Sequence, residues 1–243
     1  MKALLKNWFI GLFLAAIVTL TSTNINSAVA QKIHDPWKIS IYYSPEYTSR
    51  FISVTNDQTN IKELRKSEKG IYGYSAGLNF EKHLNARFSF GLGGKYSKKG
   101  YKKPLKPLET PVNGFDQSKG TLKTELLEFP VFVSYSYIKK EKFSLFLRLG
   151  PSFNYLIEAK EKTEFYTSGT LLETQEKLRD DANLNNFIMA GNIGTGIQAF
   201  LSKNVGFIIM PQFTYFFTPL YKDVPVKERL YSVGANAGLI FAF

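Results

Sequence analysis

Several segments of the sequence have small residues at every second position. Charged residues occur at some positions of this same parity, that is, of the same alternate set. The set comprises Lys38, Glu46, Glu81, Lys95, Glu128, Arg148 and Glu158. If that parity is enclosed, the charges must be paired, because an isolated buried charge is costly. Such pairs could form a gate, a proton path or a binding site, with Glu128, Arg148, Lys95 and Glu81 as candidates; the alternative, which we favour, is a structural plug. We expect Glu128 to approach Arg148, because their segments follow each other along the chain.

Other side chains with reactive or metal-binding groups are scarce. The chain has no cysteine and only two histidines, His34 and His83. The lack of cysteine excludes disulfides, thiolate metal sites and an acylated lipoprotein anchor, and isolated histidines predict no metal site. The sequence "GNIGTG" at Gly191 to Gly196 lies within a strand-like pattern and not between a strand and a helix, so it is not a nucleotide-binding loop. We therefore predict no cofactor and no catalytic residue.

The elements that carry the charges are predicted strands. From Phe143 to Glu158, alternate positions form an apolar face that is longer than a usual globular strand. Seven further segments alternate in the same way, and no helical period appears after the first 30 residues. The eight predicted strands are 37–47, 71–81, 88–97, 126–137, 143–158, 187–202, 207–218 and 229–243.

The connections between these segments alternate in length. The short ones lie near His83, at 139–142 and at 202–204, and the long polar ones cover 53–70, 98–121, 160–182 and 219–228. In an antiparallel meander this alternation places all short turns at one end and all long loops at the other. Outer-membrane barrels have this asymmetry, with short periplasmic turns and long extracellular loops.

The second face of the strands distinguishes a membrane barrel from a soluble one. In a soluble barrel this face would meet water and carry many charges. Here it is mostly small, as in the series Gly73, Ser75, Gly77 and Asn79. Small residues suit a narrow lumen, and the large apolar face suits lipid. The sequence thus predicts an all-β fold, an eight-stranded antiparallel up-and-down transmembrane β-barrel. Its predicted interfacial girdles comprise Trp37, Tyr47, Tyr96, Tyr135, Tyr137, Tyr155 and Tyr231.

The first 30 residues are predicted to be a cleaved signal peptide. Lys2 and Lys6 form a short positively charged region at the start of the sequence. The apolar run "FIGLFLAAIVTL" at 9–20 follows it and is too short to span a membrane comfortably as a helix. The sequence "AVA" at 28–30 supplies a small-x-small cleavage pattern, with an uncleaved anchor as the alternative. The expected domains are therefore a signal peptide at 1–30 and a barrel at 31–243. The exported chain keeps a charge of about +9, and export argues against nucleic acid as a partner.

The chain ends in the apolar sequence "NAGLIFAF". Outer-membrane barrels carry an assembly signal in the last strand, of the form polar-x-Gly-x-x-aromatic-x-aromatic, which the barrel-assembly machinery reads. Asn236, Gly238, Phe241 and Phe243 match this pattern without a gap. We therefore expect the barrel-assembly machinery as a partner and Phe243 as a strand end, although chain ends usually fray into water.

Three stretches resemble the PorT-type outer-membrane β-barrel proteins, a family often labelled porin family proteins. They are "LGGKYSKKGYK" at 92–102, "LLEFPVFVSYSY" at 126–137 and "LRLGPSFNYLI" at 147–157. In the second, Leu127, Glu128, Phe129 and Pro130 match the family's Leu-Glu-φ-Pro motif. The resemblance implies the barrel fold and a place in the outer membrane of a Gram-negative bacterium. It implies little about activity, although one member type is similar to an accessory component of type IX secretion.

Four functions are open to such a barrel. We favour a structural or interaction role, in which long loops face the medium or a partner. The resemblance implies a second role in type IX secretion, with secretion-system proteins as partners. A small pore is disfavoured, because eight strands leave no open channel. An outer-leaflet enzyme would use a histidine near the extracellular rim, whereas His34 and His83 are both predicted on the periplasmic side.

One predicted extracellular loop is strongly basic. Its sequence "KKGYKKPLKP" contains Lys98, Lys99, Lys102 and Lys103, which could pair with lipopolysaccharide phosphates. The alternative is a solvated run of charge. Outer-membrane lipid and lipopolysaccharide are therefore candidate partners.

Overall fold

The computed structural model describes residues 37–54, 69–112, 115–178, 183–222 and 226–243. The predicted signal peptide at 1–30, its cleavage site and His34 lie outside these residues. No helix in the described part of the chain combines the length and apolarity that a membrane-crossing helix needs.

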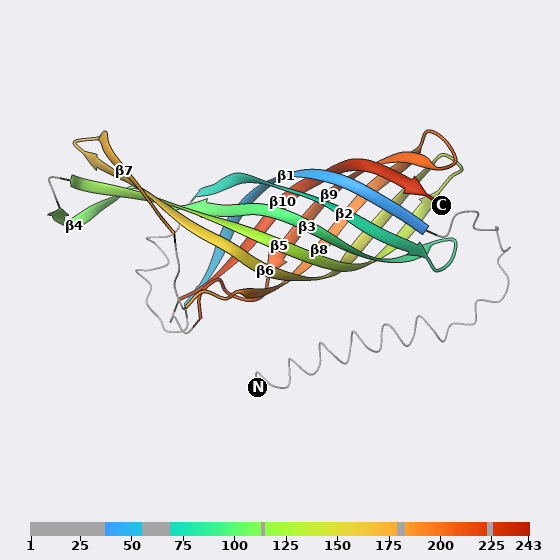
Figure 1. Ribbon diagram of the computed structural model, residues 1–243, viewed down its shortest axis with the longest axis horizontal. Coiled ribbons are helices and arrows are strands. Elements are labelled where there is room, and N and C mark those ends of the chain that lie inside the picture. Colours follow the sequence, from blue (N-terminus) through green and yellow to red (C-terminus); the bar gives the residue numbers. More distant parts are fainter. Residues whose placement is uncertain (1–36, 55–68, 113–114, 179–182, 223–225) are drawn as a thin grey trace. The chain divides into compact units, whose positions relative to one another are not determined.

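Eight antiparallel strands form a closed ring, as predicted (Figure 1). Each strand pairs with both neighbours, and the pairing of β1 with β10 and of β5 with β6 closes the sheet on itself. Their bounds are β1 Trp37–Val54, β2 Lys69–His83, β3 Phe88–Lys102, β5 Phe115–Lys139, β6 Phe143–Thr167, β8 Phe187–Phe200, β9 Val205–Phe216 and β10 Val226–Ala242. Closure leaves no open edge within the ring, which a sheet in lipid requires.

The seam of the ring joins the two ends of the barrel sequence. Ile41 lies opposite Leu239, and the register continues along β1 and β10 to Val54 opposite Val226. At the seam's end, Trp37 N donates to Phe243 O at 3.2 Å and Phe243 N donates to Trp37 O at 3.0 Å. Phe243 is therefore a hydrogen-bonded strand end, not a frayed tail.

The ring has a short-turn end and a long-connection end. At the short-turn end, tight connections at 84–87, 140–142 and 201–204 join consecutive strands, beside Trp37 and Phe243. The strand ends that lead into the connections β1–β2, β3–β5, β6–β8 and β9–β10 all lie at the opposite end of the ring. The alternation of loop lengths predicted this arrangement.

The long connections hold strands that the sequence did not predict. β4 Lys106–Val112 pairs with the first residues of β5, and β7 Thr170–Leu178 pairs with the last part of β6. The expectation of loops over the whole of 98–121 and 160–182 is wrong. β5 and β6 are each 25 residues long, and their extended ends provide the strands with which β4 and β7 pair. Strands of that length measure roughly 80 Å, far more than a membrane requires. We call the resulting four strands, β4, β5, β6 and β7, the projecting sheet.

A tight hairpin joins β6 to β7 in the projecting sheet. Ser168 and Gly169 both have positive φ, at 52° and 82°. Two such residues form the kind of turn whose twist matches antiparallel strands.

Within the ring, side chains alternate between exterior and lumen as predicted. On β1, Ile41 and Tyr43 are 58% and 52% exposed, whereas Tyr42 and Ser44 are buried. One predicted lumen charge departs from this pattern. A register shift near Ile157 pairs Glu125 with Glu158 but Leu126 with Leu156. A bulge of this kind sends the following side chains to the other face, so the prediction of Glu158 in the lumen is wrong.

Aromatic side chains gather on the exterior near the long-connection end. Tyr43 stacks on Tyr74, Tyr47 contacts Tyr72, and Tyr74 lies near Tyr96, with ring centroids 5.8, 5.6 and 6.4 Å apart. We call these rings the aromatic belt. Ten residue steps along β1 separate Trp37 from Tyr47, about 33 Å of strand or about 25 Å across the membrane at the usual tilt. That height matches the apolar band of an outer-membrane barrel.

Candidate functional site in the barrel lumen

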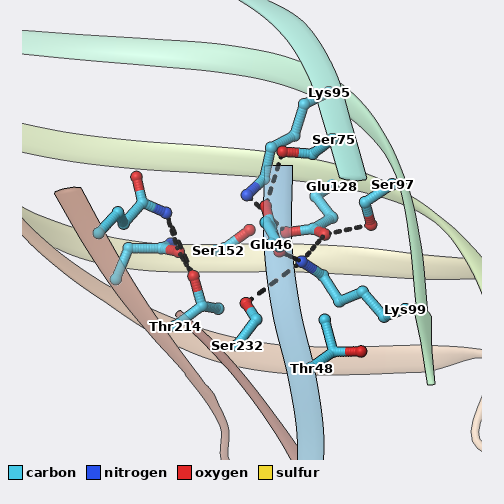
Figure 2. Close-up of polar contacts among 12 residues, drawn as sticks. Glu46, Thr48, Ser75, Lys95, Ser97, Lys99, Glu128, Ser152, Thr214 and Ser232 are labelled. Carbon is cyan, nitrogen blue, oxygen red and sulfur yellow. Dashed lines mark hydrogen bonds and ion pairs between the residues drawn. The ribbon is translucent and has the colours of Figure 1, made fainter. Parts of the chain in front are cut away.

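Four charged residues form ion pairs with one another in the lumen (Figure 2). Lys95 Nζ lies 3.1 Å from Glu128 Oε2, and Lys99 Nζ lies 3.3 Å from Glu128 Oε1. Lys99 also forms an ion pair with Glu46. The four side chains are almost completely buried. We call Glu46, Lys95, Lys99 and Glu128 the central charge cluster; its two cations and two anions balance.

Serine hydroxyls complete the polar contacts of this cluster. Ser75 Oγ donates to Glu46 Oε1 at 2.7 Å, and Ser97 Oγ donates to Glu128. Lys99 Nζ donates to Ser232 Oγ at 3.4 Å. These small residues come from β2, β3 and β10, so the side chains that make room for the charges also bind them (Figure 2).

A second ion pair lies nearer the short-turn end. Arg148 Nη2 donates to Glu81 Oε2 at 2.5 Å, and Arg148 Nε donates to Ser134 Oγ at 3.0 Å. Ser89 Oγ donates to the other Glu81 oxygen at 2.5 Å. The Arg148 guanidinium also lies 3.9 Å from the Phe132 ring centroid. Its charge is thus balanced by one carboxylate and covered by an aromatic face.

The predicted approach of Glu128 to Arg148 is wrong. Register places Glu128 opposite Asn154 on β6 and opposite Lys95 on β3, whereas Arg148 lies opposite Ser134. Glu128 therefore takes its cations from β3, on the other side of β5. All four predicted lumen candidates are buried and ion-paired, but in two separate groups.

Lys38 is the remaining predicted charge of the lumen parity. Its Nζ donates to Gln198 Oε1 at 2.8 Å and lies 5.2 Å from the Phe200 ring centroid.

Apolar side chains fill the lumen on both sides of the charges. Towards the long-connection end, residues of β3, β5, β6, β8, β9 and β10 form one buried cluster that includes Leu126, Phe216 and Leu230. Leu184 and Leu220 join it from the connections next to β8 and β9. Towards the short-turn end, Phe146, Ile208, Met210 and Ile240 form another. We call these two clusters the apolar plugs; the central charge cluster lies between them, whereas the Arg148 guanidinium lies beside the second, 5.3 Å from the Phe146 ring centroid.

The barrel opening at the long-connection end contains an ion pair that the sequence did not predict. Arg50 pairs with Glu228, and Tyr101 Oη accepts from Arg50 at 2.6 Å and donates to Glu228 Oε2 at 2.9 Å. A hollow of about 270 Å³ is lined by these two charged residues and by Lys103. Arg50 shares the parity of Glu46, so the signal was present, but the predicted strand ended at Tyr47.

The basic segment does not form a single loop. Lys98, Lys99 and Lys102 lie on β3, where side chains alternate between the two faces of the sheet. Lys99 therefore points into the lumen, and Lys98 and Lys102 do not. Lys99 is 1% exposed inside the lumen, so it cannot meet lipopolysaccharide as expected. Lys98 lies on the exterior and pairs with Glu125 at 2.8 Å; Lys103 pairs with Glu161. Lys102 is exposed.

The four residues of the proposed assembly signal lie on β10 and at its end. Asn236 is buried and donates to Gln212 Oε1 at 3.0 Å. Gly238 lies against Tyr42, where a Cβ would come 2.1 Å from Ile41 O. Phe241 and Phe243 are exposed on the lipid-facing side, at 36% and 57%.

The family comparison agrees with this architecture. A family model described as "Outer membrane protein beta-barrel domain" matches residues 29–221. The chain belongs to this family. As a member of the outer membrane protein β-barrel domain family, the protein is an integral outer-membrane barrel.

Several solved structures are similar to this family member. Neisserial surface protein A is 12% identical, with a TM-score of 0.45, over 85% of this chain and 97% of that one. OprG from Pseudomonas aeruginosa is also 12% identical, with a TM-score of 0.45, over 86% and 96%. Ail of Yersinia pestis is 16% identical, with a TM-score of 0.36, over 85% and 99%. No curated protein has a significant match to the sequence.

Proposed function

We propose that this outer-membrane barrel has a structural or interaction role, in which a plugged barrel anchors the projecting sheet for a partner protein. The observation that carries the proposal is the continuation of β5 and β6 far beyond the ring, with β4 and β7 added on either side. A barrel needs no such extension in order to span the membrane. By the usual asymmetry of these barrels, the long-connection end faces the medium.

The outer edge of β7 supports an interaction role. In the described part of the chain β7 pairs only with β6, and all nine of its residues are exposed, including Leu171, Leu172 and Leu178. An edge strand presents a row of backbone donors and acceptors to which an extended segment of a partner can add. The β4 edge is less suited to this pairing, because Pro107 has no amide hydrogen.

Proline substitutions in β7 test this role. Consecutive residues of an edge strand direct their backbone amides alternately toward the paired strand and toward the free edge. One of the two substitutions Thr174→Pro and Gln175→Pro therefore removes an amide hydrogen from the free edge of β7. Partners would be crosslinked in outer membranes and identified after pull-down. We expect one variant to lose a partner that the wild type and Thr170→Ser both capture. Equal capture by both proline variants would contradict the proposal.

We propose that the barrel does not conduct ions. The two apolar plugs and the balanced central charge cluster support a closed lumen. Planar-bilayer recordings of the purified barrel should show no stable conductance. A reproducible conductance would contradict this proposal and support the alternative of a small pore.

We also propose that the protein is not an enzyme. His83 lies at the short-turn end, away from the outer leaflet in the proposed orientation. In the described part of the chain, no cluster of three His, Asp or Glu side chains could hold a metal.

The second candidate is a PorT-like accessory role in type IX secretion. The resemblance of 92–102, 126–137 and 147–157 to PorT-type proteins favours it. Deletion of the gene should then reduce export of type IX cargo, and unchanged export would exclude this role.

A further inference from the structure

β7 is a regular edge strand over most of its length. Its pairing with β6 continues without a break over residues 173–178, and the register shift lies before this run, at Leu172. Glu173, Gln175 and Lys177 share one face of the sheet because side chains alternate along a strand, and Gln175 Nε2 donates to Glu173 Oε1 at 2.8 Å. Neither Glu173 nor Lys177 forms an ion pair with another residue of the described ranges. The edge therefore carries one anion and one cation, placed symmetrically about Gln175.

This symmetry makes the free edge of β7 complementary to a second copy of itself. Residues directly opposite each other in a sheet share a face, so a two-fold symmetric antiparallel pair must be centred on a residue. Centring on Gln175 places Glu173 opposite Lys177 of the second copy, and symmetry repeats the pair. Opposite charges at directly opposed positions stabilise a sheet. In the same register Leu172 lies opposite Leu178 of the second copy.

The two neighbouring registers lack this match. Centring on Glu176 opposes that carboxylate to its own copy, and like charges directly opposed destabilise a sheet. Centring on Thr174 opposes Lys177 to Leu171, so neither charge gains a partner of opposite sign. The sequence of β7 therefore selects the register centred on Gln175.

The direction of β7 decides where the second barrel lies. β6 runs from the short-turn end out into the projecting sheet, and β7 returns towards its own barrel (Figure 1). In an antiparallel pair the second β7 runs the opposite way, so its barrel lies at the other end of the joined sheet. β6 continues beyond Tyr155, its last residue paired with β8, for about 40 Å of strand. Two copies joined in this way face each other from two opposed membranes.

We propose that β7 pairs with β7 of a second copy in an opposed outer membrane, so that the protein joins two cells. The inference rests on the proposed function, because it names the partner of the projecting sheet and requires the long-connection end to face the medium. The paired edges exchange about six to eight backbone hydrogen bonds. One such contact buries little surface and is weak, but many copies on two cell surfaces act together.

Exchange of the two charges tests the pairing. Glu173→Lys and Lys177→Glu each oppose like charges at both symmetric positions, and each should lower association roughly tenfold or more. A mixture of the two variants restores both pairs of opposite charge and should associate like the wild type, as should the double variant Glu173→Lys/Lys177→Glu. The matched controls Glu141→Lys and Lys140→Glu make the same charge changes in a short turn and should associate normally.

Two measurements apply to all of these variants. Nanodiscs that hold one full barrel each, labelled in two colours, would be mixed and joined discs counted by fluorescence cross-correlation. Cells that carry the same variants, also in two colours, would be mixed and mixed clumps counted by flow cytometry. The first measures the pairing without reference to orientation, and the second measures the bridging of two outer membranes.

Cysteine substitutions test the register. The chain has no cysteine of its own. Gln175→Cys places two thiols directly opposite each other, where Cα atoms are about 4.5–5.5 Å apart and a disulfide can form. Thr174→Cys places them diagonally, with Cα atoms roughly 7–8 Å apart, beyond the usual span of a disulfide. We expect disulfide-linked dimers of the first variant and not of the second.

Four results would overturn the proposal. Equal association of the wild type and the single charge variants would refute the charge pairs. Failure of the mixed variants to recover would show that the substitutions damage β7 itself. Dimers of Thr174→Cys in place of Gln175→Cys would refute the register. Discs that join while cells do not clump would refute the bridging of two membranes.

Failure of this inference is distinguishable from failure of the proposed function. If no discs join but a proline substitution in β7 still abolishes capture of a different protein, the projecting sheet binds a partner other than its own copy. The proposed function then stands and the inference fails. If neither discs join nor a captured partner is lost, both fail.

Discussion

Lys99 Nζ and Glu128 Oε1 lie 3.3 Å apart inside the barrel, and neither side chain is exposed to solvent. Lys99 follows directly on Lys98, whose side chain lies on the opposite, exterior face of β3. Two adjacent lysines therefore have opposite environments, which provides a matched comparison of a buried charge with an exposed one.

Lys99→Met should strongly destabilise the barrel. The substitution leaves Glu46 and Glu128 with less compensating charge, and breaking a buried ion pair costs about 3–5 kcal/mol. Lys98→Met removes an exposed pair, which is screened by solvent, so it should cost much less than Lys99→Met. Urea-induced unfolding in lipid vesicles measures both. Equal free energies of unfolding for the two variants would refute the structural role of the central charge cluster.

Arg148 and Glu81 should behave as a coupled pair. Arg148→Leu alone leaves a buried carboxylate without its cation, with an expected cost of about 3–5 kcal/mol. The double variant Glu81→Leu/Arg148→Leu should lose less than the sum of the single variants. A double-mutant cycle in vesicles measures the coupling, and strict additivity would show that the pair contributes nothing specific.

Gly91→Ala should destabilise the barrel by about 1–3 kcal/mol through overpacking. A Cβ at Gly91 would come 2.4 Å from the Phe132 ring, on which Arg148 stacks. Gly94→Ala is the control, because a Cβ there meets no atom within 4 Å. The same unfolding measurement should show little change for Gly94→Ala; a loss as large as that of Gly91→Ala would point to a general effect of glycine replacement.

Deletion of Phe243 should lower the amount of barrel in the outer membrane. The residue supplies both hydrogen bonds to Trp37 at the seam and the last aromatic of the assembly pattern. Phe243→Tyr keeps the aromatic ring and the backbone, so it should assemble normally. Quantitative immunoblots of outer-membrane fractions distinguish the two, and normal levels of the truncated chain would exclude the assembly role.

The sequence predicts the ring well, because one physical rule acts along each membrane-spanning strand. Ile41 must face lipid and Ser44 must fit the lumen, so period two is visible in the residue types. Outside the membrane, both faces of the projecting sheet meet water and that contrast disappears. β7, in which every residue is exposed, therefore carries no alternation from which it could be predicted.

The charge partners were harder to predict than the faces. Glu128 lies in the part of β5 that pairs with both β3 and β6, and parity does not say which of these two strands supplies the cation. Glu158 was misplaced for a different reason. A bulge at one residue reverses parity, and Ile157 has no local feature that marks it as the extra residue. The alternation along a strand predicts which side chains lie in the lumen, whereas the register between strands decides which of them form ion pairs.

The seam between Trp37 and Phe243 also imposes an order on biogenesis. β1 and β10 are the first and last strands of the described ring in chain order, so their pairing cannot form until all the strands between them are available. Until then one edge of β1 is unpaired, and an unpaired edge strand can pair with a strand of another chain. A chain that lacks Phe243 lacks both hydrogen bonds to Trp37, so the end of β1 at Trp37 is left without its partner at the seam.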